Sequence, residues 1–285
     1  MNISNKYMTE EEMKRLDEFA KAVRSVIDNQ NSKYEIKPVG NRFYYENKFA
    51  EDLLPIYLRR CECEEKDLKE FNYVKNHSNY KICSISSSAR LCFIRFYNEG
   101  AHFEISLPNP VRGNAAQLDA KLENTYFECK SQEVINGEKE RLRKSYKKLL
   151  ETEFGVKNIT IVKNTLSFNL KDMGIEEFDG EYDKTHFNIK QLFTHLLAIA
   201  KKHPLIEDCV TLRYVIFKPS NKALSFYPEL YIVYEELKKE IKAIASSKSI
   251  KFFLNKHKNI KLDLKLKDVF VDIDSLETID LSKVN

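Results

Sequence analysis

The sequence predicts an α/β protein in which a central mixed β-sheet is flanked by helices, with a further helical region at the N-terminus. Two observations lead to this fold class. Residues 102–131 alternate between apolar and polar side chains, which is typical of an antiparallel meander with one buried face. Farther along, an apolar helical pattern over 187–202 precedes a nearly continuous apolar segment at 210–217, which is typical of a buried strand.

Residues 1–80 are predicted to form a mainly helical region. Thr9 and Glu12 have the spacing of a capping box, and apolar residues recur behind them at helical spacing, so we expect a helix over about 10–28. A second helical stretch around 46–60 contains Pro55, which should kink or restart it. The charged, asparagine-rich segment 61–80 marks the expected boundary with the next part.

Residues 81–246 contain the predicted core. The serines at 86–88 suit the cap of a helix that runs to Tyr97, although the same segment also suits a strand; we expect the helix. Three antiparallel strands should follow, at 102–107, 116–123 and 125–131. The order is completed by a basic helix, a β-like stretch, the apolar helix, a strand and a last long helix, over 138–153, 158–170, 187–202, 210–217 and 228–246.

Composition limits the class of protein more than it identifies a partner. The 285 residues suit one large domain or two small ones, and 42% apolar residues exclude disorder as the main state. The 47 Lys and Arg exceed the 43 Asp and Glu by only four charges. Lysines and arginines are nevertheless dense at 139–148 and 236–267, and residues 247–285 form an extension that is basic first and acidic later. Such density suits a polyanion, and a solvated helix face explains it equally well.

The cysteines and the N-terminus indicate a cytoplasmic protein. Six cysteines lack the density or spacing of a secreted disulfide framework. Cys61 and Cys63 could supply two thiolates to a metal, but no second pair follows at zinc-finger spacing, so we do not expect a zinc site. The first residues are polar, and no apolar run approaches the length of about 18 residues that spans a bilayer. We therefore expect a soluble protein with no membrane partner.

Three charged residues of the meander are expected on one face of the sheet. Glu128 and Lys130 are two residues apart in one strand, so their side chains project to the same side. The tight turn at Asn124 should place Asp119, on the preceding strand, beside them. Two carboxylates on one sheet face repel each other unless a cation neutralises them, and Mg²⁺ favours one or two carboxylates together with water and phosphate oxygens. The alternative is an ordinary ion-pair cluster on a surface meander.

Asp119, eight intervening residues and then Glu128-Cys129-Lys130 resemble the signature of the PD-(D/E)XK nuclease superfamily. The expected order of elements is similar to the restriction-endonuclease-like core of that superfamily. Local strings such as SSSARLCFIRFYN, AQLDAKLEN, YFECKSQE and FNIKQLFTHLLAIA resemble bacterial type II restriction endonucleases. The resemblance covers about residues 82–240. It departs from the signature at Leu118, where the superfamily often has proline.

The resemblance implies metal-dependent hydrolysis of DNA phosphodiester bonds, in restriction or phage defence. By motif position, Asp119 and Glu128 would bind Mg²⁺, with the main-chain carbonyl of Cys129 as a further ligand. Lys130 would orient and activate the attacking water. Gln191, on the apolar helix, matches the polar residue that this helix often contributes to the active site in the superfamily.

Further candidates each have a simpler alternative. His195 shares a helix face with Gln191 and could contact a phosphate, but a lone histidine in an apolar helix is more often a core residue. Glu104 could approach Asp119 as a third acid, or face solvent. Gln132 and Glu133 directly follow the motif and are expected at the rim of the cleft.

Double-stranded DNA is the expected partner. Phosphate contacts are assigned to cations of the basic helix, namely Arg141, Arg143, Lys144 and Lys147. Cutting both strands of a duplex favours a homodimer, and a cognate DNA methyltransferase is a further possible partner. Two rival interpretations are a non-catalytic nucleic-acid-binding module that retains the nuclease fold, and a structural protein whose charges pair across an oligomer interface.

Overall fold

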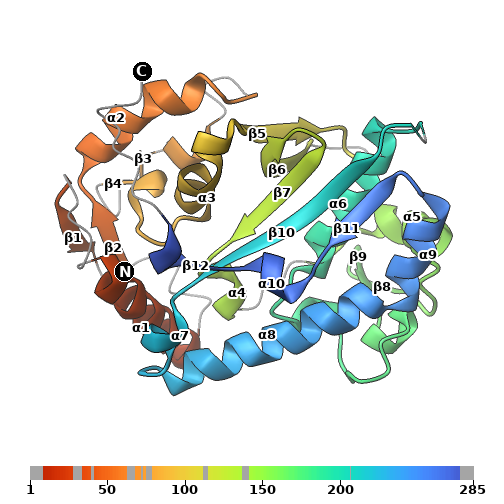
Figure 1. The fold of residues 1–285 in the computed structure, drawn as a ribbon. Coiled ribbons are helices and arrows are strands. Elements are labelled where there is room, and N and C mark those ends of the chain that lie inside the picture. The colour runs from red at the N-terminus through yellow and green to blue at the C-terminus, as the bar shows by residue number, and fades with distance from the viewer. Residues whose placement is uncertain are drawn as a thin grey trace.

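The computed structural model describes residues 9–27, 34–39, 42–62, 68–71, 73–74, 79–111, 115–136, 141–205 and 207–276. Its centre is a mixed sheet whose main path runs in the order β11-β10-β7-β6-β5 (Figure 1). The strands of that path are β5 (His102–Leu107), β6 (Ala116–Leu122), β7 (Thr125–Lys130), β10 (Val210–Lys218) and β11 (Ile260–Asp263). The predicted α/β class with a central mixed sheet flanked by helices is confirmed.

The meander formed by β5, β6 and β7 is antiparallel, as the alternating pattern predicts. β10 then pairs in parallel with β7, with Tyr214 opposite Glu128. On its other edge, β10 pairs in parallel with β11 and, farther along, with β12 (Phe270–Asp272). β7 and β10 are therefore interior strands, which fits the buried pattern of β10.

Two helices cover opposite faces of the sheet at β7. α3 (Ser88–Phe96) begins at the serines as expected, because the side chain of Ser87 accepts the N–H of Arg90. Its Phe96 packs on Phe127, with ring centroids 4.3 Å apart. α6 (Ile189–Lys202) covers the other face, and the residue after it, His203, hydrogen-bonds the hydroxyl of Tyr126 at 2.9 Å. Successive residues of β7 thus face different helices.

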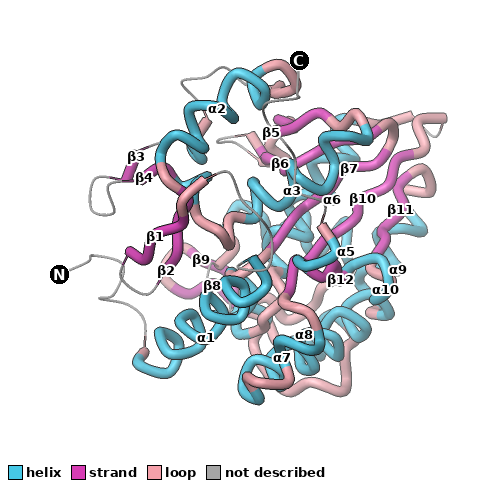
Figure 2. Tube along the Cα trace, turned by 60° about the vertical axis from the view of Figure 1, so that its left-hand side comes forward, coloured by secondary structure: helices cyan, strands magenta, loops and turns pink. Residues whose placement is uncertain are grey.

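The N-terminal elements lie together at one side of the sheet, beyond α3 (Figures 1 and 2). They are α1 (Glu10–Ile27), the hairpin of β1 (Ile36–Val39) and β2 (Arg42–Tyr45), α2 (Asn47–Leu58), and the short pair β3 (Tyr73–Val74) and β4 (Asn79–Tyr80). The Thr9 and Glu12 capping box is confirmed by reciprocal hydrogen bonds. α2 continues through Pro55, because the buried side chains of Leu53, Ile56 and Tyr57 hold both sides of the proline.

Three expected elements are wrong in detail. The basic helix begins later than expected, as α5 (Lys147–Phe154), and residues 137–140 of the expected range lie outside the described residues. The β-like stretch at 158–170 is a hairpin of β8 (Thr160–Val162) and β9 (Thr165–Ser167), separate from the central sheet. Lys163 and Asn164 form its turn with positive φ angles of 45° and 72°. The C-terminal extension contributes two strands, β11 and β12, to the sheet itself.

The remaining helices contribute residues to one buried apolar cluster. They are α4 (Glu133–Asn136), α7 (Asn221–Leu224), α8 (Pro228–Ser246), α9 (Lys248–Lys256) and α10 (Leu266–Val269). Pro228 occupies the first turn of α8, as expected. Buried apolar side chains from Phe19 to Ile273 belong to a single cluster that includes all three predicted parts of the chain. Within the described ranges, no helix is long and apolar enough to cross a membrane.

Candidate active site

Asp119 and Glu128 face each other where β6 and β7 part. The recorded pairing ends at Ala120 opposite Phe127, and one further step of this register puts Asp119 opposite Glu128. Here the Asp119 carboxylate, through Oδ2, accepts the main-chain N–H of Cys129 at 2.6 Å. A side-chain oxygen thus takes the place of a strand carbonyl, which fixes the Asp119 carboxylate at the end of the β6–β7 ladder.

Glu128 is the central group of the cluster and is 3% exposed. Its Oε1 lies 2.9 Å from Nζ of Lys130. Its Oε2 lies 3.7 Å from Nδ1 of His195, which comes from α6. The Lys130 side chain is 13% exposed, so this ion pair is largely withdrawn from water. Charges in such a place interact strongly because solvent screens them little.

The cluster shifts the pKa of two of its members. Burial, and then the charge of Glu128, raise the pKa of Asp119 well above its usual value. Burial and the charge of Lys130 lower the pKa of His195 to about 3, against an opposing hydrogen bond with the Gln117 backbone. His195 is therefore neutral near pH 7. The surroundings of Asp119 thus favour its uncharged form. A bound cation would instead stabilise the charged carboxylate.

Cys129 takes part through its main chain. Its thiol hydrogen-bonds Cys92 of α3, on the face opposite Glu128, and burial raises the pKa of both thiols. Only the carbonyl oxygen of Cys129 could therefore act as a ligand beside Glu128. Cys61 is partly buried, while Cys63 lies outside the described residues.

The register of β5 and β6, which pairs Phe103 with Ala120 and Ile105 with Leu118, places Glu104 next to Asp119. Glu104 has a positive φ of 53°, and its carboxylate accepts a hydrogen bond from the Tyr57 hydroxyl at 3.1 Å. Within the described part of the chain, no three His, Cys, Asp or Glu side chains form a group that could hold a metal. A cation here would depend on Asp119, Glu128 and main-chain or water oxygens.

α6 brings His195 and Gln191 over the charged face, but it does not expose them equally. His195 is 4% exposed, so it lies in the interior and not on a surface open to phosphate. Of the two alternatives for this histidine, its burial fits the core residue. Tyr214 approaches its Nδ1 at 3.5 Å. Gln191 lies one turn earlier, and its buried Oε1 has no hydrogen-bond partner among the described residues. An unsatisfied buried acceptor fits a role toward a water or a cation.

Glu133 lies closer to the charged cluster than its expected place at the rim suggests. Its negative charge contributes to the raised pKa of Asp119. It also lines a small cavity, about 10 Å³ in volume, together with Lys130, Asn188 and Tyr214. This volume is close to the minimum that holds one water molecule. Sequence reasoning missed Asn188, although an asparagine before an apolar helix is a typical N-cap, and its side chain does accept the Gln191 N–H.

The expected phosphate-binding cations form an exposed segment that is only partly available. Arg143 and Lys144 are exposed. Arg141 pairs with Asp183, and Lys147 lies 3.8 Å from Glu151, so these two have acidic partners within the chain. The charge that this segment offers to a polyanion therefore resides mainly in Arg143, Lys144 and Lys148.

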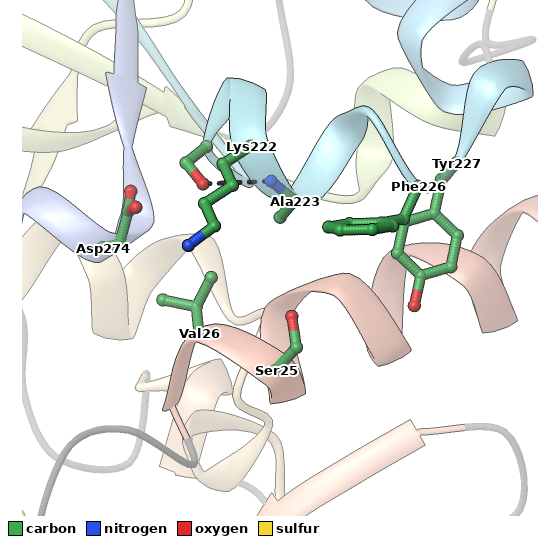
Figure 3. A pocket seen from close by; sticks show the side chains of 8 residues that line it. Ser25, Val26, Lys222, Ala223, Phe226, Tyr227 and Asp274 are labelled. Atoms are coloured by element: carbon green, nitrogen blue, oxygen red, sulfur yellow. Dashed lines mark hydrogen bonds between the residues drawn. The ribbon is translucent and has the colours of Figure 1, made fainter.

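A much larger cavity, of about 470 Å³, lies elsewhere (Figure 3). It is formed between the end of α1, at Ser25 and Val26, and the segment from Lys222 to Tyr227. Asp274 lies at its far side. None of Asp119, Glu128 and Lys130 lines it, so cavity size does not identify the charged site.

Comparison of the chain with descriptions of known protein families, with curated proteins and with solved structures gave no match. The likeness to nucleases therefore remains the one carried by the motif itself.

Proposed function

We propose that the protein is a Mg²⁺-dependent DNA endonuclease of the PD-(D/E)XK type, acting in restriction or phage defence. In this proposal α3, β5, β6, β7, α6 and β10 form its restriction-endonuclease-like core. The observation that carries the proposal is the strand register, which sets Asp119 opposite Glu128 with Lys130 two residues farther along β7. An incidental Asp/Glu-x-Lys string would not be expected to coincide with this pairing.

The donor set fits a magnesium ion. Burial and then the charge of the adjacent Glu128 raise the pKa of Asp119, and a divalent cation would remove the repulsion between the two acids. The Cys129 carbonyl would complete the protein ligands. A bound Mg²⁺ would supply Lewis-acid stabilisation of the phosphate and of the attacking water.

The chain's own residues divide the remaining tasks. Asp119 is held in place by the Cys129 N–H, and Glu128 by Lys130. Lys130 would position the water and stabilise negative charge that develops on the phosphate. His195 adds no second cation beside Glu128, because its pKa of about 3 leaves the ring neutral near pH 7. Gln191 would take up a water or a ligand with its unsatisfied oxygen.

The test is cleavage of plasmid and phage DNA, methylated and unmethylated, in Mg²⁺ or in EDTA. Wild-type protein should cleave only with the metal, and Asp119→Ala should abolish cleavage while the protein stays folded. Calorimetry should show Mg²⁺ or Mn²⁺ binding that depends on Asp119 and Glu128. Absence of both cleavage and such binding would exclude the nuclease. A comparison of the two DNA substrates also tests for a methyltransferase partner, and the mass in solution tests the proposed homodimer.

The low exposure of Glu128 and Lys130 favours one alternative, a DNA-binding module without catalysis. In that case binding should weaken linearly in log salt and should not respond to divalent ions. Asp119→Ala would then leave DNA affinity unchanged.

A further inference from the structure

The hairpin of β8 and β9, residues 160–167, is separate from the central sheet (Figure 1) and pairs instead with part of the basic stretch. Arg143 forms an antiparallel bridge with Thr165 of β9. Beside that bridge, the main-chain N–H of Lys144 donates to the carbonyl of Asn164 at 3.0 Å. The basic stretch therefore runs along β9 as a third strand, with β9 in the middle.

One face of this small sheet is fixed to the core. Leu142 and Leu166 lie opposite each other on it, and both are fully buried. Phe168, directly after β9, stacks on Tyr182 with ring centroids 4.2 Å apart, and its ring lies 6.3 Å from that of Phe193 on α6. α6 is also the helix that covers the charged face of β7. The hairpin thus has a firm base next to the helix of the candidate active site.

The opposite face is turned to solvent, and one row of side chains crosses it. Thr165 pairs with Val162 across the hairpin and with Arg143 on its other side, and residues paired in this way project to the same face. Val162 is 45% exposed, and Arg143 is exposed as well. The Thr165 hydroxyl donates to the carbonyl of Val162, so its lone pairs can still accept a hydrogen bond. The row offers an apolar group, an acceptor and a guanidinium side by side.

The turn of the hairpin adds a cation and an amide. Lys163 and Asn164 form the turn, and both are exposed. Lys163, Arg143 and Lys144 are three cations near this end of the small sheet, and none has an acidic partner within the described part of the chain. Such a group of cations complements the phosphates of a nucleic acid.

Duplex DNA fits this surface better than a second copy of the chain does. A second copy could add a strand to the outer edge of β8, but that strand has only three residues and ends at Lys163, and both features discourage strand pairing. The major groove of DNA is about 12 Å wide and admits a two-stranded ribbon. An asparagine such as Asn164 can bond the edge of adenine, and methyl groups such as those of Val162 and Thr165 can contact the thymine methyl.

We propose that the β8–β9 hairpin enters the major groove of duplex DNA and reads base edges there, while Arg143 and Lys144 hold the flanking phosphates. The choice of DNA as partner rests on the proposed nuclease function. The contact itself does not depend on cleavage.

The variant Lys163→Gly/Asn164→Gly, here called the tip variant, removes both side chains of the turn and keeps a sequence that suits positive φ angles. Lys157→Gly/Asn158→Gly is a matched control, because it changes the same two residue types, both exposed, with Asn158 also at a positive φ of 53°, before β8 and away from the turn. Both are made in an Asp119→Ala parent, so that bound DNA stays intact in Mg²⁺. Each protein selects from a pool of short duplexes with randomised centres, and the bound duplexes are sequenced.

The parent and the control should enrich the same sequence, and the tip variant should bind it about 5- to 100-fold more weakly. Replacing its purines by 7-deazapurines, which lack the N7 acceptor of the major groove, should weaken the parent and not the tip variant. Equal enrichment by the tip variant and the control would overturn the proposal. Affinity lost equally for all sequences would also overturn it, because the turn would then contact only phosphates.

Two further measurements separate this proposal from its neighbours. If the parent self-associates in solution and the tip variant does not, the hairpin binds a second copy and the proposal is wrong. Cleavage by the wild-type chain tests the nuclease independently: cleavage with a sequence preference that the tip variant keeps would leave the nuclease standing and exclude the hairpin. Selection that depends on the turn, in a protein that cuts nothing, would do the reverse.

Discussion

The protein carries two concentrations of charge that differ in their surroundings. The buried cluster consists of Asp119, Glu128, Lys130 and His195, and the basic segment is 141–148. In the buried cluster, members change one another's pKa, because little water screens them. In the basic segment, Arg141 and Lys147 pair with local acids, while Arg143 and Lys144 face solvent. Similar residue types thus interact strongly when they are enclosed and contribute only weak, screened attraction when they are exposed.

The largest effect is expected where the buried ion pair is broken. Lys130→Met leaves the carboxylate of Glu128, which is 3% exposed, without its cation at 2.9 Å. We expect unfolding free energy to fall by about 3–5 kcal/mol and cleavage to fall by about 100- to 1000-fold. Urea unfolding and single-turnover kinetics measure the two effects.

The double variant Glu128→Gln/Lys130→Met is the control for that change. It removes both charges, so it should recover most of the lost stability while cleavage stays at least as low as in Lys130→Met. If the double variant is as unstable as Lys130→Met, packing of the lysine stem, and not the charge pair, accounts for the loss.

Acid should weaken the fold through His195. Its pKa is about 6.5 when unfolded and about 3 in the folded protein, so between these values the unfolded chain binds the extra proton. Stability is therefore retained above pH 6.5 and lost as pH falls, by about 1.4 kcal/mol per pH unit. Between pH 6.5 and about 4.5 this amounts to roughly 3 kcal/mol.

His195→Gln should remove that share of the acid sensitivity, as measured by urea unfolding in EDTA across this pH range. Parallel pH profiles for the variant and the wild type would show that His195 binds its proton equally in both states, against the buried position described above.

The sequence predicts those parts of the arrangement whose signals lie within a single segment. The meander, α3, α6 and α8 follow from side-chain period and caps within each segment. β11 and β12 were missed because each is only a few residues long and its pairing with β10 depends on tertiary contact. The juxtaposition of Asp119 and Glu128 was predictable, since a tight turn fixes the register between adjacent strands; the enclosure of Lys130 by α4 was not.

Divalent cations should stabilise the buried cluster specifically. Mg²⁺ or Mn²⁺ at a hundred times its dissociation constant should add about 2.7 kcal/mol to the unfolding free energy if it binds only the folded chain. Asp119→Asn should lose most of this increment, because it removes one of the two facing carboxylates. Thermal unfolding with and without the metal measures it. An equal increment in both proteins would assign the cation to another site.

The basic segment should give the smallest effect, seen only in the salt dependence of DNA binding. Arg143→Ala/Lys144→Ala removes two exposed cations, and if both contact phosphates the slope of log affinity against log salt should lessen by about 2. Affinity itself should fall several-fold at low salt and very little at high salt. Lys157→Ala/Lys184→Ala is a matched control, because both lysines are exposed and lie outside the basic stretches. Equal slopes for the two variants would mean that DNA does not contact Arg143 and Lys144. The basic segment would then be an ordinary solvated surface.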